Sequence, residues 1–266
     1  MRIRATVAAV TGALALSAFA VPAAQAVDNP LSGVTFSNVK VNSGKNIVVG
    51  PTGQVTVTAT YTVTHPANVG ASTFDTGPLL YRGTKITAPT DLLGGDDAGT
   101  CTAASTTVLH CTAKIQFRPA ATDEFDDLSN VQAGAWKVGA LAVGDGSNIK
   151  WQGDLGAQKV QRLSKLTVNA APEPVKKGKT ITVTGKLTRA NWDGKNYTGY
   201  AAQPVKLQFR KKGSTTYTTV KTVKTSSVGN LSTTVKASVD GYFRYVFAGS
   251  TTTPAVNAMG DFVDVK

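Results

Sequence analysis

Residues 55–63 alternate apolar side chains with threonine at every second position. Strict alternation with a period of two predicts a β-strand that buries one face and exposes the other. Valine and threonine are β-branched, which lowers their helix propensity and suits a pleated, half-buried surface. Gly50 and Pro51 form a turn signal before this strand, and His65-Pro66 ends it. This pattern therefore predicts a β-strand over residues 55–63.

The same pattern recurs along nearly the whole chain, and only residues 120–131 could instead hold a helical turn or a long ordered loop. Turn-forming residues separate the apolar runs at the spacing of small antiparallel sandwiches. The predicted strands are 34–41, 55–63, 79–86, 108–117, 136–143, 149–152, 163–168, 181–187, 205–209, 217–223, 231–235, 243–247 and 262–265. We therefore predict an all-β protein of two tandem antiparallel β-sandwich domains.

Charge divides the chain near residue 160. Residues 27–160 contain 9 Lys and Arg against 11 Asp and Glu, whereas residues 161–266 contain 17 against 5. Such asymmetry between halves indicates two domains with different surfaces. Pro172 and Pro174 follow the boundary and predict an edge position or a strand switch. The predicted domains are 27–163 and 164–266.

The first 26 residues have the pattern of a secretory signal peptide. Arg2 and Arg4 precede an apolar run, and Ala24-Gln25-Ala26 supplies a small-residue cleavage site. The run is short for a transmembrane helix, and no second apolar stretch of about 18 residues follows. We expect a mature chain that starts near Val27, has no membrane span and is secreted into the extracellular space.

Cys101 and Cys111 are the only cysteines, and an exported chain meets oxidising conditions. Alternation around Cys111 places it on the apolar face of a strand, and Cys101 would enter from the preceding strand of the same hairpin. A redox-active pair would show a C-x-x-C spacing or a basic neighbourhood, and neither is present. The sequence therefore predicts a structural disulfide.

The C-terminal hundred residues resemble the immunoglobulin-like modules that recur in secreted proteins of actinobacteria. The segments that carry the resemblance are EPVKKGKTITVTGKLTR (173–189), QPVKLQFRKKGSTTYTTVKTVKT (203–225) and GNLSTTVKASVDGYFRYVFAGSTTT (229–253). The resemblance implies an immunoglobulin-like sandwich over residues 164–266 and a noncatalytic role. The N-terminal half resembles no family.

Catalytic groups are scarce. The two histidines are His65, at a predicted strand end, and His110, on the face opposite Cys111, and both read as surface residues. A hydrolase needs a nucleophile beside a base that a third group orients, and no known catalytic or nucleotide-binding motif occurs. We predict that the protein is not an enzyme.

An acidic segment is the candidate metal site. It contains four carboxylates within five residues: Asp123, Glu124, Asp126 and Asp127. Calcium takes six to eight oxygen ligands, of which loop carboxylates supply a part. The spacing is not that of an EF-hand, and a solvated acidic loop is the alternative. A secreted calcium-binding protein is therefore the second function that the sequence allows.

Basic residues cluster in the C-terminal half and attract polyanions through salt-sensitive forces. The candidate polyanion-binding residues are Lys176, Lys177, Lys179, Arg210, Lys211 and Lys212. Weak aromatic interleaving does not favour single-stranded nucleic acid. Lysines that only maintain solubility and protect edge strands are the alternative.

Trp192 and Tyr197 lie in one loop and form a candidate carbohydrate-stacking pair, because aromatic faces are rigid and partly apolar. A tryptophan that caps its own core is the alternative. Together these patterns favour a secreted, noncatalytic binding or structural protein that associates with cell-envelope polyanions or carbohydrate through its basic domain. The sequence does not determine its oligomeric state.

Overall fold

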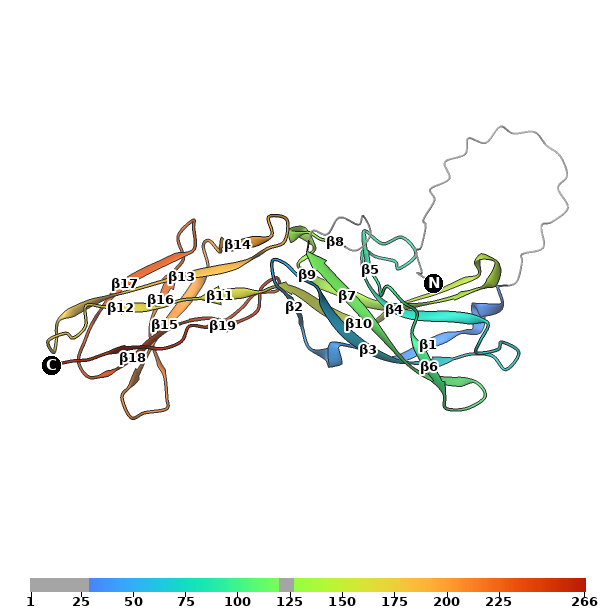
Figure 1. Cartoon of the computed structure of the whole chain (residues 1–266), viewed down its shortest axis with the longest axis horizontal. Coiled ribbons are helices and arrows are strands. Elements are labelled where there is room, and N and C mark those ends of the chain that lie inside the picture. Colours follow the sequence, from blue (N-terminus) through green and yellow to red (C-terminus); the bar gives the residue numbers. More distant parts are fainter. Residues whose placement is uncertain (1–28, 120–126) are drawn as a thin grey trace, which may run out of the picture. The chain divides into compact units, whose positions relative to one another are not determined.

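A computed structural model describes residues 29–119 and 127–266, which form four five-stranded sheets (Figure 1). The predicted all-β class is confirmed. The signal-peptide prediction concerns residues outside this described part. No helix within residues 29–119 and 127–266 is long and apolar enough to cross a membrane.

The chain divides into two compact units. The first unit includes residues 57–116 and 137–157 and the described residues up to Gly44, and the second includes 45–56, 117–136 and 158–266. The second unit therefore contains all of the chain after residue 158 together with the ends of several earlier strands.

Strands β1 to β10 form two of the four sheets. The first sheet has the order β1-β3-β7-β6, with β8 beside β7: β1 (Thr35–Val41), β3 (Val55–Thr64), β7 (Val108–Pro119), β6 (Thr100–Ala103) and β8 (Asp127–Leu128). The second has the order β2-β10-β9-β4-β5: β2 (Ile47–Val49), β10 (Ile149–Arg162), β9 (Gly134–Gly144), β4 (Phe74–Arg82) and β5 (Asp91–Leu93). Because β2 runs parallel to β10 and β1 pairs with β3, the first two strands belong to different sheets.

The alternation in β3 has the predicted effect. Ala59, Tyr61 and Val63 are buried, while Thr58, Thr60 and Thr64 are exposed. Tyr61 and Val63 belong to an apolar cluster that also contains Cys111 and Phe74. Period-two patterning therefore sets which face of this sheet covers the core.

The disulfide between Cys101 and Cys111 is confirmed. The two residues lie directly opposite one another on β6 and β7, with their Cα atoms 4.1 Å apart. Cys111 is buried, as its strand position predicts.

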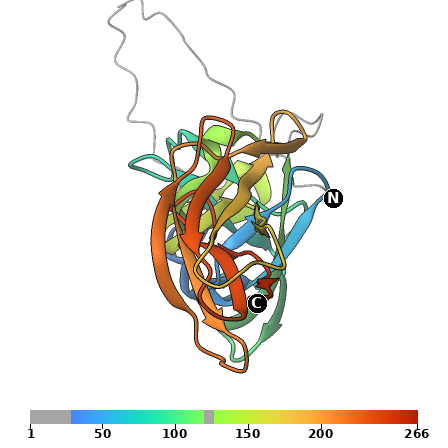
Figure 2. The same cartoon turned by 90° about the vertical axis from the view of Figure 1, so that its left-hand side faces the viewer.

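Strands β11 to β20 form the other two sheets, coloured yellow to red in Figures 1 and 2. One sheet centres on β13 and contains β11 (Ser164–Leu166), β12 (Asn169–Ala171), β13 (Thr180–Asn191), β14 (Asn196–Gly199) and β17 (Asn230–Lys236). The other has the order β16-β15-β18-β19, with β20 also beside β18: β15 (Pro204–Lys211), β16 (Thr218–Lys224), β18 (Gly241–Phe247), β19 (Val256–Asn257) and β20 (Asp261–Val263).

This connectivity is immunoglobulin-like. The first, second and fifth main strands (β11/β12, β13 and β17) share one sheet, and β15, β16, β18 and β19/β20 share the other. The core between the sheets includes Leu187, Leu207 and Tyr245, all fully buried. The prolines after β12 coincide with the predicted strand switch, since β12 ends at Ala171, directly before Pro172.

Four short 3-10 turns complete the described chain: η1 (Pro30–Gly33), η2 (Asn42–Gly44), η3 (Asn130–Gln132) and η4 (Asp145–Ser147). The turn between β9 and β10 is η4. Of the segment 120–131, residues 120–126 lie outside the described part, and η3 occupies its end.

Two strands differ from the prediction by five or more residues at one end. β4 begins at Phe74, and β10 continues to Arg162 where a strand of four residues was expected. The backbone of β10 is irregular at Asp154, which has a φ of 56°. This irregularity interrupts the period-two pattern, so the sequence pattern did not predict that the strand continues. The hydroxyl group of buried Tyr81 accepts a hydrogen bond from the Asp154 backbone and donates one to its carboxylate, both at 3.0 Å. This contact holds the irregular position in the strand.

Candidate functional site

The six basic residues predicted from the sequence gather at one end of the second sandwich. Lys176, Lys177 and Lys179 lie on the turn between β12 and β13, and Arg210, Lys211 and Lys212 lie where β15 ends. We call these six residues the basic end. Both groups are tied to the connection between β17 and β18: Gly178 N donates to Ala237 O, and Lys212 N donates to Asp240 O. Both groups therefore lie beside the same connection, and polyanion binding by these residues stays a prediction.

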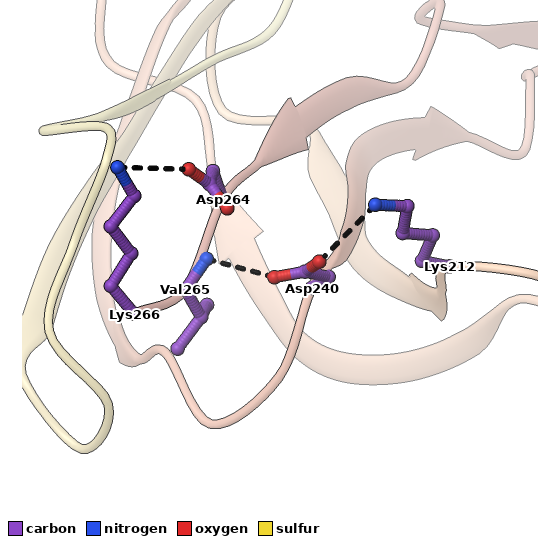
Figure 3. Close-up of polar contacts among 5 residues, drawn as sticks. All are labelled: Lys212, Asp240, Asp264, Val265 and Lys266. Atoms are coloured by element: carbon purple, nitrogen blue, oxygen red, sulfur yellow. Dashed lines mark hydrogen bonds and ion pairs between the residues drawn. The ribbon is translucent and has the colours of Figure 1, made fainter.

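Two carboxylates at this end are already engaged (Figure 3). Asp240 accepts a hydrogen bond from Val265 N at 2.9 Å and lies 3.4 Å from Lys212 Nζ. The backbone bond from Val265 and the bond from Lys212 lower the pKa of Asp240 despite partial burial. Asp264 lies 3.8 Å from Lys266 Nζ. Asp240 therefore offsets only Lys212 within the basic end.

The remaining lysines of the basic end carry uncompensated charge. Lys176, Lys177, Lys179 and Lys211 are exposed and form no ion pair with any residue that the structure describes. Exposed lysines keep their mobility, so they attract an anionic partner as point charges and do not fix its orientation.

A second group of cations lies on the outward face of the adjoining sheet. In β15 the inward positions are Val205 and Leu207, so the alternate residues Gln208 and Arg210 face outward. In β18 the inward positions Phe243, Tyr245 and Phe247 are buried, which turns Tyr242 and Arg244 outward. The register pairs Arg210 with Tyr242 and Gln208 with Arg244.

These outward residues stack with neighbouring side chains in a continuous series of cations and rings. We call it the cation–π ladder, and its members in order are Arg244, Tyr217, Arg210, Tyr242, Phe262 and Lys212. Arg244 Cζ lies 3.8 Å from the centre of the Tyr217 ring. Arg210 Cζ lies 5.2 Å from Tyr217 and 4.2 Å from Tyr242. The Tyr242 and Phe262 rings are 5.1 Å apart, and Lys212 Nζ is 5.4 Å from Phe262.

Stacking on the rings holds the guanidinium planes of Arg210 and Arg244 in place. Neither group has a carboxylate partner among the described residues. Arg210 donates to Ser214 O at 2.6 Å, and Arg244 donates to Gln208 Oε1 at 3.0 Å. Neither forms an ion pair with any residue in the described part of the chain. Each cation–π contact at an exposed site contributes about 0.5–1 kcal/mol. The ladder therefore presents preorganised, uncompensated guanidinium groups, which bind phosphate and carboxylate well.

The sequence analysis found Arg210 and Lys212 but missed the other four ladder residues. The signal was present, since Tyr242 and Arg244 alternate with three buried aromatic residues in β18. An aromatic residue at an outward position of a strand does not fill the core. The sequence prediction did not take this exposed aromatic position into account.

The carbohydrate-stacking prediction is wrong for Trp192. Its side chain is fully buried, and its indole Nε1 donates to Val49 O at 3.3 Å. A buried ring has no free face for a sugar, so Trp192 acts as a core anchor of the second unit. Tyr197 is half-buried, with Lys165 Nζ 3.9 Å from its ring centre. Because Trp192 is buried, Trp192 and Tyr197 do not form a surface on which a sugar ring could stack.

Most of the acidic segment lies outside the described residues. Asp123, Glu124 and Asp126 lie outside the described residues, and Asp127 is described only by the backbone pairing of β8 with Arg118. Within residues 29–119 and 127–266, no group of three or more His, Cys, Asp or Glu is placed to hold a metal ion. Calcium binding by the acidic segment therefore stays a prediction.

The two histidines have different environments. His110 is exposed, as predicted, but His65 is only 4% exposed, so its surface assignment is wrong. The His65 ring packs edge-on against Phe74, with centres 5.8 Å apart, and Nδ1 lies 3.1 Å from Pro66 O. The proline that ends the strand thus turns the imidazole into the core.

Comparison with known proteins yields only distant similarity. No protein-family model and no curated protein matches the sequence. Solved structures match at low scores: latent PorU from Porphyromonas gingivalis (12% identity, TM-score 0.28, 90% of this chain and 20% of that one) and the adhesin InvE from Yersinia pseudotuberculosis (13%, 0.27, 87% and 58%). Three N-terminal domains of the bacteriophage RB49 outer capsid protein Hoc match at 10% identity and TM-score 0.32, over 88% and 70%. Similarity at this level supports no functional inference.

Proposed function

We propose that this protein is a secreted, noncatalytic binding protein that associates with polyanions of the cell envelope. The observation that carries the proposal is the cation–π ladder, in which Arg210 and Arg244 are held against tyrosine rings without a carboxylate partner. The basic end adjoins the ladder through Arg210 and Lys212, which belong to both.

The two surfaces supply different parts of recognition. The exposed lysines of the basic end attract a polyanion over a distance that depends on ionic strength. The fixed guanidinium groups of the ladder can form paired hydrogen bonds to phosphate or carboxylate. The rings of Tyr217 and Tyr242 offer partly apolar surface against which sugar rings pack. A polymer that combines sugars or polyols with anionic groups fits this set best.

Secretion is part of the proposal and rests on two observations. The N-terminal segment has the pattern of a signal peptide, and the disulfide between Cys101 and Cys111 is typical of oxidising compartments. The resemblance of residues 164–266 to secreted actinobacterial modules supports the same location.

We take 27–163 and 164–266 as the domains of the mature chain. The noncatalytic part rests on the scarcity of catalytic groups in the sequence.

A pull-down with isolated cell-wall material tests the proposal. The full mature chain should bind at low salt, where the Debye length is about 30 Å, and should be released at about 1 M salt, where it is about 3 Å. Replacement of Lys176, Lys177 and Lys179 by Gln should weaken binding. The matched control replaces the exposed lysines Lys40, Lys85 and Lys114 by Gln and should bind like the unmodified protein. Absence of binding at any salt concentration would refute the proposal.

A further inference from the structure

Two arginines at the start of the second sandwich lie away from the ladder. Arg162, the last residue of β10, is 6% exposed, and its Nε donates to the carbonyl oxygen of Ala190. Arg189 lies on β13 and stacks on Tyr200, with Cζ 3.9 Å from the ring centre. The Tyr200 ring in turn packs edge-on against Phe247, with centres 5.7 Å apart. Both guanidinium groups are therefore held in place by protein contacts.

Neither arginine has a carboxylate partner. No ion pair to Arg162 or Arg189 occurs among residues 29–119 and 127–266. Asp193 is the one acid whose charge acts on Arg162, but its carboxylate accepts hydrogen bonds from Asn130. Burial and the neighbouring charge of Arg189 lower the pKa of Arg162 to about 10. Burial also lowers the pKa of Arg189.

Hydroxyl groups from the connection between β18 and β19 surround Tyr200. Arg189 Nη1 donates to Thr252 Oγ1 at 3.5 Å, and the Tyr200 hydroxyl lies 3.3 Å from Ser250 Oγ. Burial alone would raise the pKa of Tyr200, but contacts with these hydroxyls and the charge of Arg189 outweigh it and lower the pKa. Thr253 is fully buried, and its Oγ1 forms no hydrogen bond within the described structure.

This arrangement has the chemistry of an oxyanion-binding site. The charge of Arg162, which is buried, and that of Arg189, which is half-buried, repel one another, and burying an uncompensated charge is costly. An oxyanion with several acceptor oxygens would pair with the guanidinium groups and accept hydrogen bonds from hydroxyls. Phosphate matches best, because its oxygens suit the planar fork of arginine.

We propose that Arg162 and Arg189, together with the hydroxyl groups of Ser250, Thr252 and Thr253, bind one phosphate group. The site is independent of the ladder and does not rest on the proposed function. The phosphate comes either from solution or from a phosphate-bearing polymer, since both present the same oxyanion.

Thermal unfolding of the full mature chain tests this site with inorganic phosphate at matched ionic strength in chloride. A ligand that binds only the folded protein raises the Tm by mass action. Phosphate should raise the Tm of the unmodified protein and of Lys40→Gln, which removes an exposed charge outside this site, the basic end and the ladder. The rise should be clearly smaller in Arg189→Gln. An equal rise in all three proteins, or no rise in the unmodified protein, would overturn the proposal.

Titration followed by phosphorus NMR provides the second readout. Arg189→Lys keeps the charge but lacks the planar fork, so it should bind inorganic phosphate about tenfold more weakly than the unmodified protein. Unchanged affinity in this variant would contradict the assignment. A glycerol phosphate oligomer serves as the polymer arm, and tighter binding of the oligomer than of inorganic phosphate identifies a polymer as the source. Tighter binding that Arg189→Gln leaves intact would instead place the oligomer on another surface.

Discussion

At the scale of single residues, strand position decides what an aromatic side chain does in this protein. Trp192 and Tyr245 are fully buried, and each donates a hydrogen bond to a backbone carbonyl. Tyr217 and Tyr242 face outward and stack with arginine. The same residue type therefore stabilises the core in one position and presents a binding surface in another.

The disulfide should make a large contribution to stability. Replacement of Cys101 by Ser together with Cys111 by Ala should lower the free energy of unfolding by about 3 kcal/mol, because closing a short loop restricts the unfolded chain. Urea denaturation of both proteins measures the difference. A loss of less than about 1 kcal/mol would show that the crosslink adds little beyond the hairpin itself.

Burial of Tyr245 should make stability depend on alkaline pH. Burial raises the pKa of Tyr245 to about 12, from about 10 for an exposed tyrosine. The unfolded chain therefore ionises first, and the contribution of Tyr245 is complete below about pH 10 and is lost as pH rises toward 12. The difference in unfolding free energy between the unmodified protein and Tyr245→Phe should shrink from pH 9 to pH 11, by about 1 kcal/mol.

The control for this measurement is the variant itself. Tyr245→Phe removes the ionisable group and the 2.8 Å hydrogen bond to Val183 O, so part of the difference is independent of pH. A difference that stays constant across this range would contradict the assigned pKa.

At the scale of elements, local patterning accounts for most of the sheets. The long alternating strands β3, β7, β13 and β18 were predicted because one buried face imposes a period of two on the sequence. The short strands β2, β5, β12 and β19 were not, because two or three residues carry no period. Their positions depend on pairing with strands distant in sequence, which local patterns do not encode.

The candidate sites show the same division. The sequence predicted the basic residues because they are clustered in the chain, but it did not predict the ladder, whose members come from β15, β16, β18 and β20 and the residues beside them. Only the register between these strands brings Arg210, Tyr242 and Phe262 together. Trp192 was misassigned because its loop sequence does not reveal that the indole reaches Val49 O.

Gly185 should be required where strand β13 passes close to its neighbours. A Cβ atom at this position would collide with Thr167 O and would lie 2.8 Å from the Tyr245 ring. Gly185→Ala should therefore lower the free energy of unfolding by about 1–3 kcal/mol, measured by urea denaturation.

Gly77 in β4 provides the matched control, because a Cβ atom there would meet nothing within 4 Å. Gly77→Ala should leave stability unchanged or raise it by up to about 1 kcal/mol, since alanine restricts the unfolded chain. Equal destabilisation by both substitutions would contradict the steric explanation and point to a general intolerance of alanine in these strands.

At the scale of the whole molecule, charge is the property that separates the two halves of the sequence. The C-terminal 106 residues hold 17 of the 28 Lys and Arg residues and only 5 acidic ones. In the structure this excess includes three groups of cations: the exposed lysines of the basic end, the stacked arginines of the ladder, and the pair of buried Arg162 and half-buried Arg189. Each group implies a different dependence on salt and on anion shape.

The most direct test of the central claim is the affinity of the full chain for a glycerol phosphate polymer over a range of salt concentrations. The account predicts that affinity falls as salt rises and that Arg210→Gln with Arg244→Gln weakens low-salt binding about tenfold or more. The control Lys40→Gln with Lys114→Gln removes the same charge from exposed positions elsewhere and should change affinity by no more than about twofold. Equal losses in both double variants, or binding that neither changes, would contradict the claim that the ladder is the binding surface.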